Sequence, residues 1–369
     1  MLEHGSFAIE ETIRQAVAAG AATSVALSIS RSSGPIKEWY SGTHLPNMGG
    51  LPCSAQSFFD LASLTKPLST TLWFLRAVHT GLINFDDPLE KYLSLDDPTL
   101  RRTPVWRLLT HTTGLPAHKR YYEGYGARIM TAKRRMETKR SVRRSLKSER
   151  IAPTMQNSEK YSDLGYLVIE EVTQNAVGQP LEIGWHTLPN HSQESLHFSP
   201  IPLNIAPDKY VATEWCPWRK TLLQGEVHDD NAWVMGGICG HAGLFGTLNN
   251  VHEHGRQWLR AIRGEPNNLG IGQDTLTMAL SRSNMARSGT RVMGWDTPTP
   301  GASSSGKYFG PKSIGHLGFT GTSIWMDPVQ DVLIVLLTNR VCPNRDDIRI
   351  RRLRPKLHDL AWTWLEGES

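Results

Sequence analysis

No stretch of this 369-residue sequence is apolar over the roughly 20 residues that a helix needs to cross a bilayer. The first 14 residues include three glutamates, whereas a secretory signal has a basic start and then an apolar segment. Hydrophobic residues make up 39% of the chain and charged residues 20%, as in ordinary globular proteins. We therefore expect a globular, enzyme-sized protein without a membrane span, located in the cytoplasm.

Cysteine is also scarce. The four cysteines, Cys53, Cys216, Cys239 and Cys342, are widely spaced, and no two of them form a C-x-x-C pair. This spacing argues against both a disulfide framework and a cysteine zinc site. We interpret all four as reduced, structural thiols.

Motifs of several enzyme and cofactor classes are missing. The chain has no G-x-S-x-G, the nucleophile elbow of α/β-hydrolases, and no G-x-G-x-x-G in a strand-to-helix setting, which a nucleotide site would need. A group of histidines and aspartates invites a metal interpretation but matches no compact ligand spacing such as H-E-x-x-H. These residues are His111, His228, Asp229, Asp230 and His241. We expect turn-forming and packing roles for them, with no metal and no cofactor.

Positive charge is concentrated in one segment. Residues 119–150 contain twelve Lys or Arg and only three Glu, in a chain of net charge +5. Such a run can attract an acidic substrate or a polyanion, but aromatic residues for stacking on bases are confined to Tyr121, Tyr122 and Tyr125. We interpret the segment as a solvated helix face or a flexible insertion, and we expect no nucleic-acid partner.

Hydrophobic periodicity predicts regular elements at both ends of the chain. A first helix ends near Gly20, a strand with one buried face follows over residues 23–31, and residues 36–41 return as a second strand. Late in the chain, residues 291–295, 315–326 and 332–338 each predict one strand. A closing helix is predicted from Asp346 or Asp347 onward.

The order of these elements predicts an α/β (α+β) fold. Strands at both ends suggest one antiparallel sheet flanked by helices, and the patterns between them are mainly helical or irregular. We expect a sheet domain made of residues 1–85 and 271–369. Residues 86–270 then form a mainly helical domain that carries the basic insertion 119–150, and a cleft between the two lobes is a usual place for a site.

Ser63 and Lys66 are the strongest candidates for chemistry. In the sequence Ser-Leu-Thr-Lys at a predicted helix start, one turn brings a hydroxyl and an amine onto the same face. A serine hydroxyl is a poor nucleophile until a base removes its proton, and positive potential at the helix start favours a neutral lysine. A second copy, with Ser304 and Lys307, lies in a Gly- and Ser-rich stretch, and we interpret it as a loop.

Two further motifs lie at compatible distances along the chain. In Tyr-Ser-Asp, the phenol of Tyr161 can relay a proton and the carboxylate of Asp163 can hold the lysine. In His-Leu-Gly, Gly318 lets a substrate approach the backbone of a strand that begins near His316. The N–H of Phe319 can then pair with that of Ser63 as an oxyanion hole.

These three motifs, in this order, resemble those of the serine β-lactamase and penicillin-binding protein superfamily. The tyrosine motif is similar to the branch of class C β-lactamases, D-alanyl-D-alanine carboxypeptidases and related cytosolic esterases. Segments 107–116, 227–246 and 318–328 strengthen the resemblance, which spans about residues 55–340. The resemblance implies that fold, with Ser63 as the nucleophile and Lys66 and Tyr161 as the acid and base pair.

The same comparison implies a substrate-lining strand with His316 and Gly318, and it exposes two departures. Asp163 stands where the family motif usually ends in Asn, which adds a negative charge beside Lys66 and can keep that lysine protonated. His316 stands in place of a lysine, so a fixed positive charge for a substrate carboxylate is missing near neutral pH. Both departures argue against an efficient β-lactamase.

We therefore expect a serine hydrolase that forms an acyl enzyme on Ser63. Its expected partner is a small ester, amide or peptide substrate, and an esterase or amidase fits the cytoplasmic expectation and His316 best. The alternatives are a D-alanyl-D-alanine carboxypeptidase or weak β-lactamase, and a catalytically silent relative that uses the cleft to bind a ligand, which Asp163 and the basic run would permit.

Overall fold

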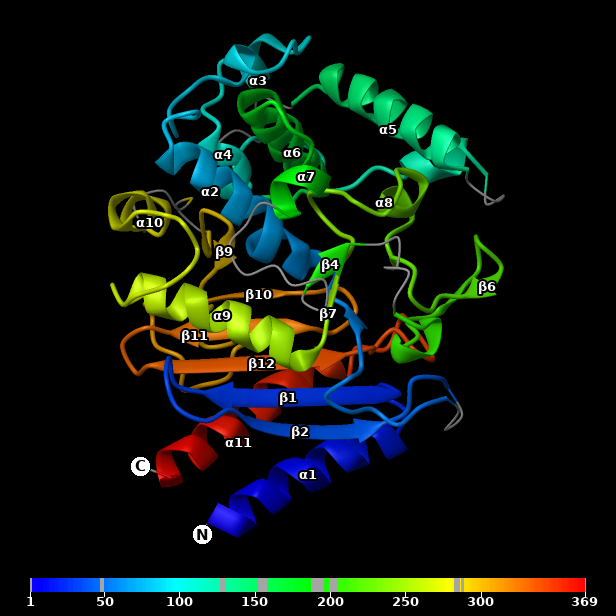
Figure 1. Ribbon diagram of the computed structural model, residues 1–369, viewed down its shortest axis with the longest axis vertical. Coiled ribbons are helices and arrows are strands. Elements are labelled where there is room, and N and C mark those ends of the chain that lie inside the picture. Colours follow the sequence, from blue (N-terminus) through cyan, green and yellow to red (C-terminus); the bar gives the residue numbers. More distant parts are fainter. Residues whose placement is uncertain are drawn as a thin grey trace.

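The computed structural model describes residues 2–46, 50–126, 131–151, 158–186, 196–198, 205–281, 286 and 289–368. Its central feature is a seven-stranded antiparallel sheet with the strand order β2-β1-β12-β11-β10-β9-β8 (Figure 1). The strands are β1 (Ser24–Ser30), β2 (Lys37–Gly42), β8 (Arg291–Val292), β9 (Trp295–Asp296), β10 (Ile314–Leu317), β11 (Ser323–Asp327) and β12 (Val332–Thr338). The first two strands pair with the last ones, which confirms a sheet built from both ends of the chain.

Helices cover both faces of this sheet. Helices α1 (Leu2–Ala18) and α11 (Ile350–Glu368) pack against each other on one face, and α9 (Leu248–Ile262) packs on the other (Figure 1). All seven residues of β1 are buried, so the prediction of a single buried face is wrong. The hydroxyls of Ser28 and Ser30 lie under α9 and both bond the ring of His252 at 2.7 Å. The alternation of apolar and small polar residues along β1 thus marks two buried faces, one apolar and one bearing hydroxyls. It does not mark a buried face and a solvent-exposed face.

Two of the late strand predictions are wrong in the same way. The segment 291–295 is a hairpin, because Gly294 at φ +81° turns β8 back into β9. The segment 315–326 is likewise two strands, β10 and β11, which pair across a tight turn. By contrast, β12 has the predicted bounds, and α11 begins at Ile350, a few residues after the predicted start.

The middle of the chain forms a mainly helical lobe above the sheet (Figure 1). Its helices are α2 (Leu72–His79), α3 (Pro98–Arg101), α4 (Trp106–Leu109), α5 (Ala132–Lys147), α6 (Asp163–Val177), α7 (Leu181–His186), α8 (Asp230–Val234) and α10 (Gln273–Ala279). It also contains short strands that the sequence did not predict, namely β3 (Phe59–Asp60), β4 (His197–Phe198) and β7 (Leu244–Gly246) in one sheet, and β5 (Trp215–Cys216) and β6 (Thr221–Leu222) in another. Strands of two or three residues are too short to show an alternating pattern.

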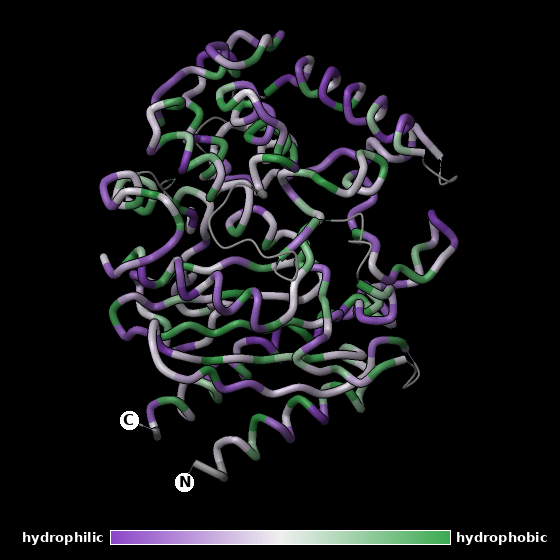
Figure 2. Tube along the Cα trace, in the orientation of Figure 1, coloured by the Kyte–Doolittle hydropathy of each residue, from purple (hydrophilic) through white to green (hydrophobic). Residues whose placement is uncertain are grey.

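The basic segment is only partly a solvated helix face. Figure 2 shows α5 as a largely hydrophilic helix at the edge of the lobe. Arg140 and Arg144 are exposed, but Lys139 and Arg143 both pair with the buried carboxylate of Glu170 on α6, at 2.9 and 3.0 Å. Part of the positive charge therefore attaches α5 to the lobe.

Two further expectations from composition can be compared with the structure. The four cysteines are all buried and unpaired, which agrees with reduced structural thiols. Within the ranges given above, no helix has both the length and the apolar character that crossing a membrane requires.

Candidate active site

The candidate nucleophile lies on a strained turn between β3 and α2. Ser63 belongs to a short 3₁₀ helix, η1 (Ala62–Leu64), which continues through a π-helix, η2 (Lys66–Thr71), into α2. Ala62 has φ +47°, which costs free energy for a residue with a side chain. The buried carboxylate of Asp60 holds the turn, because it accepts hydrogen bonds from the N–H of Ala62 at 2.7 Å and of His228 at 2.6 Å.

Lys66 is the centre of the site. Its side chain is fully buried, and its ammonium donates three hydrogen bonds: to Ser63 Oγ at 3.0 Å, to Asp163 Oδ1 at 2.8 Å and to the carbonyl of His241 at 3.1 Å. The nitrogen also lies 4.9 Å from the centre of the Tyr161 ring. The structure thus brings together the predicted residues Ser63, Lys66, Tyr161 and Asp163.

The Lys66–Asp163 pair is charged. Burial lowers the pKa of Lys66, but the Asp163 carboxylate and Tyr161 more than offset this and hold that pKa above its usual value. Burial likewise raises the pKa of Asp163, and the Lys66 ammonium and the hydrogen bond from His118 outweigh it, so that pKa lies far below its usual value. The sequence suggests two opposite effects: the helix start favours a neutral Lys66, and the charge of Asp163 favours a protonated one. In the structure the effect of Asp163 is larger, so the lysine is a cation.

Packing and an N-cap fix the tyrosine motif. Ser162 caps α6, because its Oγ accepts a hydrogen bond from the N–H of Gly165 at 3.0 Å. The N–H of Ser162 in turn donates to Nδ1 of His111 at 3.0 Å, and the His111 ring packs on that of Tyr161 with 4.5 Å between centres. His111 is buried at φ +57°, so it has the turn-forming and packing role that we expected.

The third motif lies at the end of β10, not at the start of a strand. His316 is buried 6.1 Å from the Tyr161 ring, and burial, together with the nearby cations Lys66 and Arg291, lowers its pKa to about 3. It is therefore neutral near pH 7. A Cβ on Gly318 would lie 2.7 Å from the carbonyl oxygen of Leu61, so only glycine lets β10 approach the nucleophile turn this closely.

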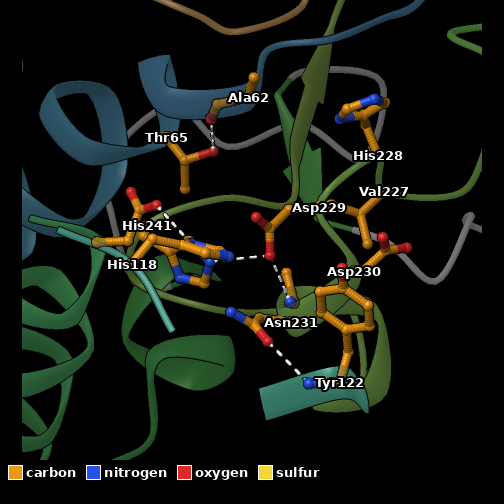
Figure 3. Close-up of polar contacts among 12 residues, drawn as sticks. Ala62, Thr65, His118, Tyr122, Val227, His228, Asp229, Asp230, Asn231 and His241 are labelled. Atoms are coloured by element: carbon orange, nitrogen blue, oxygen red, sulfur yellow. Dashed lines mark hydrogen bonds and ion pairs between the residues drawn. The ribbon is translucent and has the colours of Figure 1, made fainter. Parts of the chain in front are cut away.

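A cleft of 620 Å³ opens in front of Ser63. Its lining is rich in charged and aromatic side chains, and Figure 3 shows several of them converging from different segments. The lining residues are Ala62, Ser63, His118, Arg120, Tyr122, Tyr161, Asp163, His228, Asp229, Asp230, His241, Ala242, Phe319, Arg345 and Asp346. The motifs alone did not identify five of these residues, namely His118, Arg120, Tyr122, Arg345 and Asp346. Tyr122 lies in a short 3₁₀ helix, η4 (Tyr121–Gly124), and the other four lie in loops with no distinctive spacing.

Two Asp–His pairs line this cleft. His241 Nε2 lies 3.0 Å from Asp229 Oδ1 (Figure 3). His118 Nδ1 lies 3.2 Å from Asp163 Oδ2. Asp229 has the turn-forming role that we expected, because its carboxylate caps α8 (Asp230–Val234) and accepts a hydrogen bond from the N–H of Ala232 at 2.7 Å. In addition, His228, Asp229, Asp230 and His241 all border the cleft, which their spacing did not predict. Within the described ranges, no group of three or more His, Cys, Asp or Glu side chains is arranged to hold a metal ion.

The second Ser-x-x-Lys copy does not form a comparable site. Ser304 and Lys307 lie in the loop before β10, as expected. The Lys307 ammonium is 4.8 Å from the centre of the Tyr308 ring, and Lys307 is exposed. The same spacing therefore brings serine and lysine together only at Ser63 and Lys66, because only that copy lies in a helical turn with a buried lysine.

The fold and the motifs together define a class of protein, the serine hydrolases with a β-lactamase fold. The β-lactamase family model matches residues 9–358, and the chain belongs to that family. Among curated relatives, a putative D-alanyl-D-alanine carboxypeptidase of Escherichia coli (strain K12) is 27% identical over 323 residues, which cover 77% of this chain and 69% of that protein.

Solved structures show the same fold at low sequence identity. EstCE1, described as a hydrolase with promiscuous acyltransferase activity, aligns with a TM-score of 0.72 at 17% identity and covers 98% of this chain and 99% of its own. A class C β-lactamase aligns with a TM-score of 0.69 at 16% identity, covering 99% and 98%. The D-amino acid amidase of Ochrobactrum anthropi aligns with a TM-score of 0.68 at 16% identity, covering 99% of both. The chain is thus a serine hydrolase with a β-lactamase fold.

Proposed function

We propose that this protein is an esterase or amidase that hydrolyses small esters or amides through an acyl enzyme on Ser63. The observation that carries the proposal is the 3.0 Å hydrogen bond from the buried Lys66 ammonium to Ser63 Oγ, at the bottom of an open cleft. A hydroxyl in this position is accessible to substrate and is held by a cation that stabilises the developing alkoxide.

In the proposed reaction, Ser63 Oγ attacks the carbonyl carbon of the substrate while its proton leaves through the hydroxyl of Tyr161. Lys66 is already a cation, so it donates to Oγ and does not remove the proton. Tyr161 passes the proton to the leaving group as the carbon–oxygen or carbon–nitrogen bond breaks. Water then attacks the acyl enzyme, and the same relay returns a proton to Ser63.

We assign the oxyanion hole to the backbone N–H groups of Ser63 and Phe319. Both residues line the cleft. In the described part of the chain, neither N–H donates a hydrogen bond to any protein group, whereas the N–H of Ala62 and of Gly318 are both bonded. Two unpaired donors beside a nucleophile are what a tetrahedral oxyanion requires.

The substrate preference follows from the charges around the site. Neither His316 nor Gly318, which we expected to line the substrate, is among the residues that border the cleft. His316 is buried behind it and neutral near pH 7, so β10 offers no fixed cation for a carboxylate. A neutral ester or amide therefore fits this site better than a peptide with a free C-terminal carboxylate. The names of the esterase and amidase structures with the same fold are compatible with this preference.

A D-alanyl-D-alanine carboxypeptidase is the second candidate, and one observation favours it. Arg120 and Arg345 also line the cleft and provide cations at its outer part. Arg345 is partly engaged by Glu214 at 3.2 Å, so its capacity for a substrate carboxylate is reduced. The curated relatives named as putative carboxypeptidases support keeping this reaction, with weak β-lactamase activity, as the alternative.

A fluorophosphonate probe followed by mass spectrometry tests the mechanism. We expect a covalent adduct on Ser63 in the parent protein and none in a folded Ser63→Ala variant. A folded parent without an adduct would instead favour the catalytically silent, ligand-binding alternative.

Turnover of three substrates then separates the enzymatic candidates: short nitrophenyl esters, a D-alanyl-D-alanine peptide and nitrocefin. We expect the esters to react fastest. A higher kcat/KM for the peptide would establish the carboxypeptidase, and a higher kcat/KM for nitrocefin a β-lactamase.

A further inference from the structure

A second cavity, of 360 Å³, lies on the other side of the turn that follows β10. Its lining residues come from the loop before β10, from the end of β10 and the turn after it, from the segment between β12 and α11, and from the start of α11. They are Ala302, Ser303, Ser304, Leu317, Gly318, Arg340, Ile348, Ile350, Arg351 and Arg354. None of them lines the cleft of Ser63, so the two cavities are separate.

Three arginines and no carboxylate line this second cavity. Among the described residues, no Asp or Glu lies within ion-pair distance of Arg340, Arg351 or Arg354. The neighbouring arginines differ, because Arg345 pairs with Glu214 and Arg349 pairs with Asp347. The three arginines that line the cavity therefore lack ion-pair partners in the described structure, whereas Arg345 and Arg349 nearby in the sequence have them.

Arg354 contributes a buried cation to this cavity. Its side chain is only 5% exposed, and its Nε has no hydrogen-bond partner in the described structure. Burial, followed by repulsion from Arg340, lowers the pKa of Arg354 to about 10. Burial, followed by repulsion from Arg345 and Arg351, lowers the pKa of Arg340, and the carboxylates of Asp347 and Asp346 partly offset this. A buried guanidinium with a free donor beside other cations is the environment that a bound anion stabilises.

Two of the three cations are held by the turn after β10. Arg340 Nε donates to the carbonyl of Phe319 at 2.8 Å, and Arg354 Nη2 donates to the carbonyl of Gly321 at 3.1 Å. These bonds hold both guanidinium groups before any ligand arrives, which reduces the entropy cost of binding. Planar guanidinium groups match the geometry of phosphate oxygens and bind them with paired hydrogen bonds.

We propose that this cavity is a binding site for the phosphate group of a small molecule, separate from the cleft of Ser63. Three cations without an acidic partner favour a dianion over a singly charged group. Two serines, Ser303 and Ser304, line the same cavity and add neutral polar groups to it. The proposal does not depend on the reaction assigned to Ser63, because it rests on other residues.

Calorimetric titration of the full chain with inorganic phosphate tests the site, with sodium chloride at equal ionic strength as the reference. Arg351→Gln removes an exposed lining cation, and we expect it to bind phosphate about tenfold more weakly than the parent. The matched control is Arg352→Gln, an equally exposed arginine on the same helix turn that does not line the cavity, and it should bind like the parent.

A third variant locates the bound anion. Arg345→Gln removes a cation from the Ser63 cleft and should leave phosphate affinity unchanged. A parallel titration with glycerol 3-phosphate distinguishes the source of the group, since tighter binding than inorganic phosphate indicates a phosphomonoester and equal or weaker binding indicates free phosphate. No heat above the chloride reference, or a loss of affinity in Arg345→Gln but not in Arg351→Gln, would overturn the proposal.

Discussion

Two largely buried lysines of this protein each pair with a carboxylate of helix α6, and only one of the two lies beside a candidate nucleophile. Lys66 pairs at 2.8 Å with Asp163, the first residue of α6, and Lys139 of α5 pairs at 2.9 Å with Glu170, about two turns later. In both lysines, burial lowers the pKa, but the paired carboxylate, together with other acidic groups nearby, raises it by more, so the pKa lies above its usual value. Charge alone does not distinguish the two pairs.

The difference lies in what else each lysine touches. Lys66 also bonds Ser63 Oγ, which faces an open cleft. Lys139 also bonds the carbonyl of Ile238 at 2.8 Å and pairs with Glu182 of α7 at 3.2 Å, so it joins α5 to the rest of the lobe. A perturbed pKa therefore indicates a functional site only when the group also reaches a cleft and a reactive atom.

Replacing Lys66 should have the largest effect. In Lys66→Met, Asp163 is left partly buried without its cation and Ser63 loses its donor. We expect kcat/KM for a nitrophenyl ester to fall by about 10³-fold and the free energy of unfolding by about 3–5 kcal/mol. Steady-state kinetics and urea unfolding measure the two losses.

A double variant separates the two losses. Lys66→Met with Asp163→Asn removes the unpaired carboxylate, so stability should recover while activity stays low. Recovery of activity as well would contradict the role given to the Lys66 cation.

Asp163→Asn alone should change the pH dependence of activity more than the maximal rate. Without the carboxylate, burial dominates at Lys66, its pKa falls, and the ammonium that donates to Ser63 is lost at a lower pH. We expect the alkaline limb of the kcat/KM profile to move to lower pH and kcat to fall by about tenfold. His118→Gln, which removes the other partner of Asp163 but leaves the ion pair, is the control and should not move that limb. An unchanged limb in Asp163→Asn would refute the assignment.

The same variant should also alter acid stability. The pKa of Asp163 is lowered in the folded protein, whereas an aspartate in the unfolded chain has a pKa of about 3.9. Its contribution to stability is therefore complete above about pH 4 and is lost as the pH falls toward the folded value. We expect the difference in unfolding free energy between the parent and Asp163→Asn to shrink on acidification, as measured by urea unfolding at a series of pH values. A difference that grows below pH 4 would contradict the pairing.

Lys139→Met provides the contrast to Lys66→Met. Because Arg143 still pairs with Glu170 at 3.0 Å, we expect a loss of about 2–3 kcal/mol in the free energy of unfolding, below the usual cost of an unpaired buried charge. The kcat/KM of the folded protein should equal that of the parent, since Lys139 does not line the cleft. A fall in activity of the folded variant beyond about twofold would show that the two pairs are functionally coupled.

The sequence predicted the parts of the fold that long patterns encode. Strand β12, in which six apolar residues are followed by Thr338, has the predicted bounds. The pattern predicts continuous strands where the structure has the hairpin at Gly294 and the turn between β10 and β11. In both places the chain reverses direction over few residues, which interrupts the apolar pattern little. The short strands of the helical lobe depend on pairing between distant segments, which periodicity does not reveal.

For the candidate site, the spacing of Ser63 and Lys66 fits one helical turn, but Ser304 and Lys307 share it. The helix signal after Ser63 and the two further motifs distinguished the first copy. The structure places Tyr161 next to Ser63 and Lys66, although about 95 residues separate it from Lys66, and motif resemblance was the signal that found it. Nothing in the local sequence of His118 or Arg345 marked them, since they reach the cleft only through the packing of loops. The charge state of Lys66 also required the structure, because it depends on the distance to Asp163.

The smallest expected effect comes from the outer end of α5. Lys147 is 39% exposed and lies 3.7 Å from Glu171, so solvent screens the pair and Lys147→Ala should lower the free energy of unfolding by less than about 1 kcal/mol. Arg140→Ala, which removes an exposed cation of the same helix, should change it by no more than about 0.5 kcal/mol. Urea unfolding of both variants beside Lys139→Met measures the gradient. If Lys147→Ala cost as much as Lys139→Met, burial would not be what separates a structural ion pair from a solvated one on this helix.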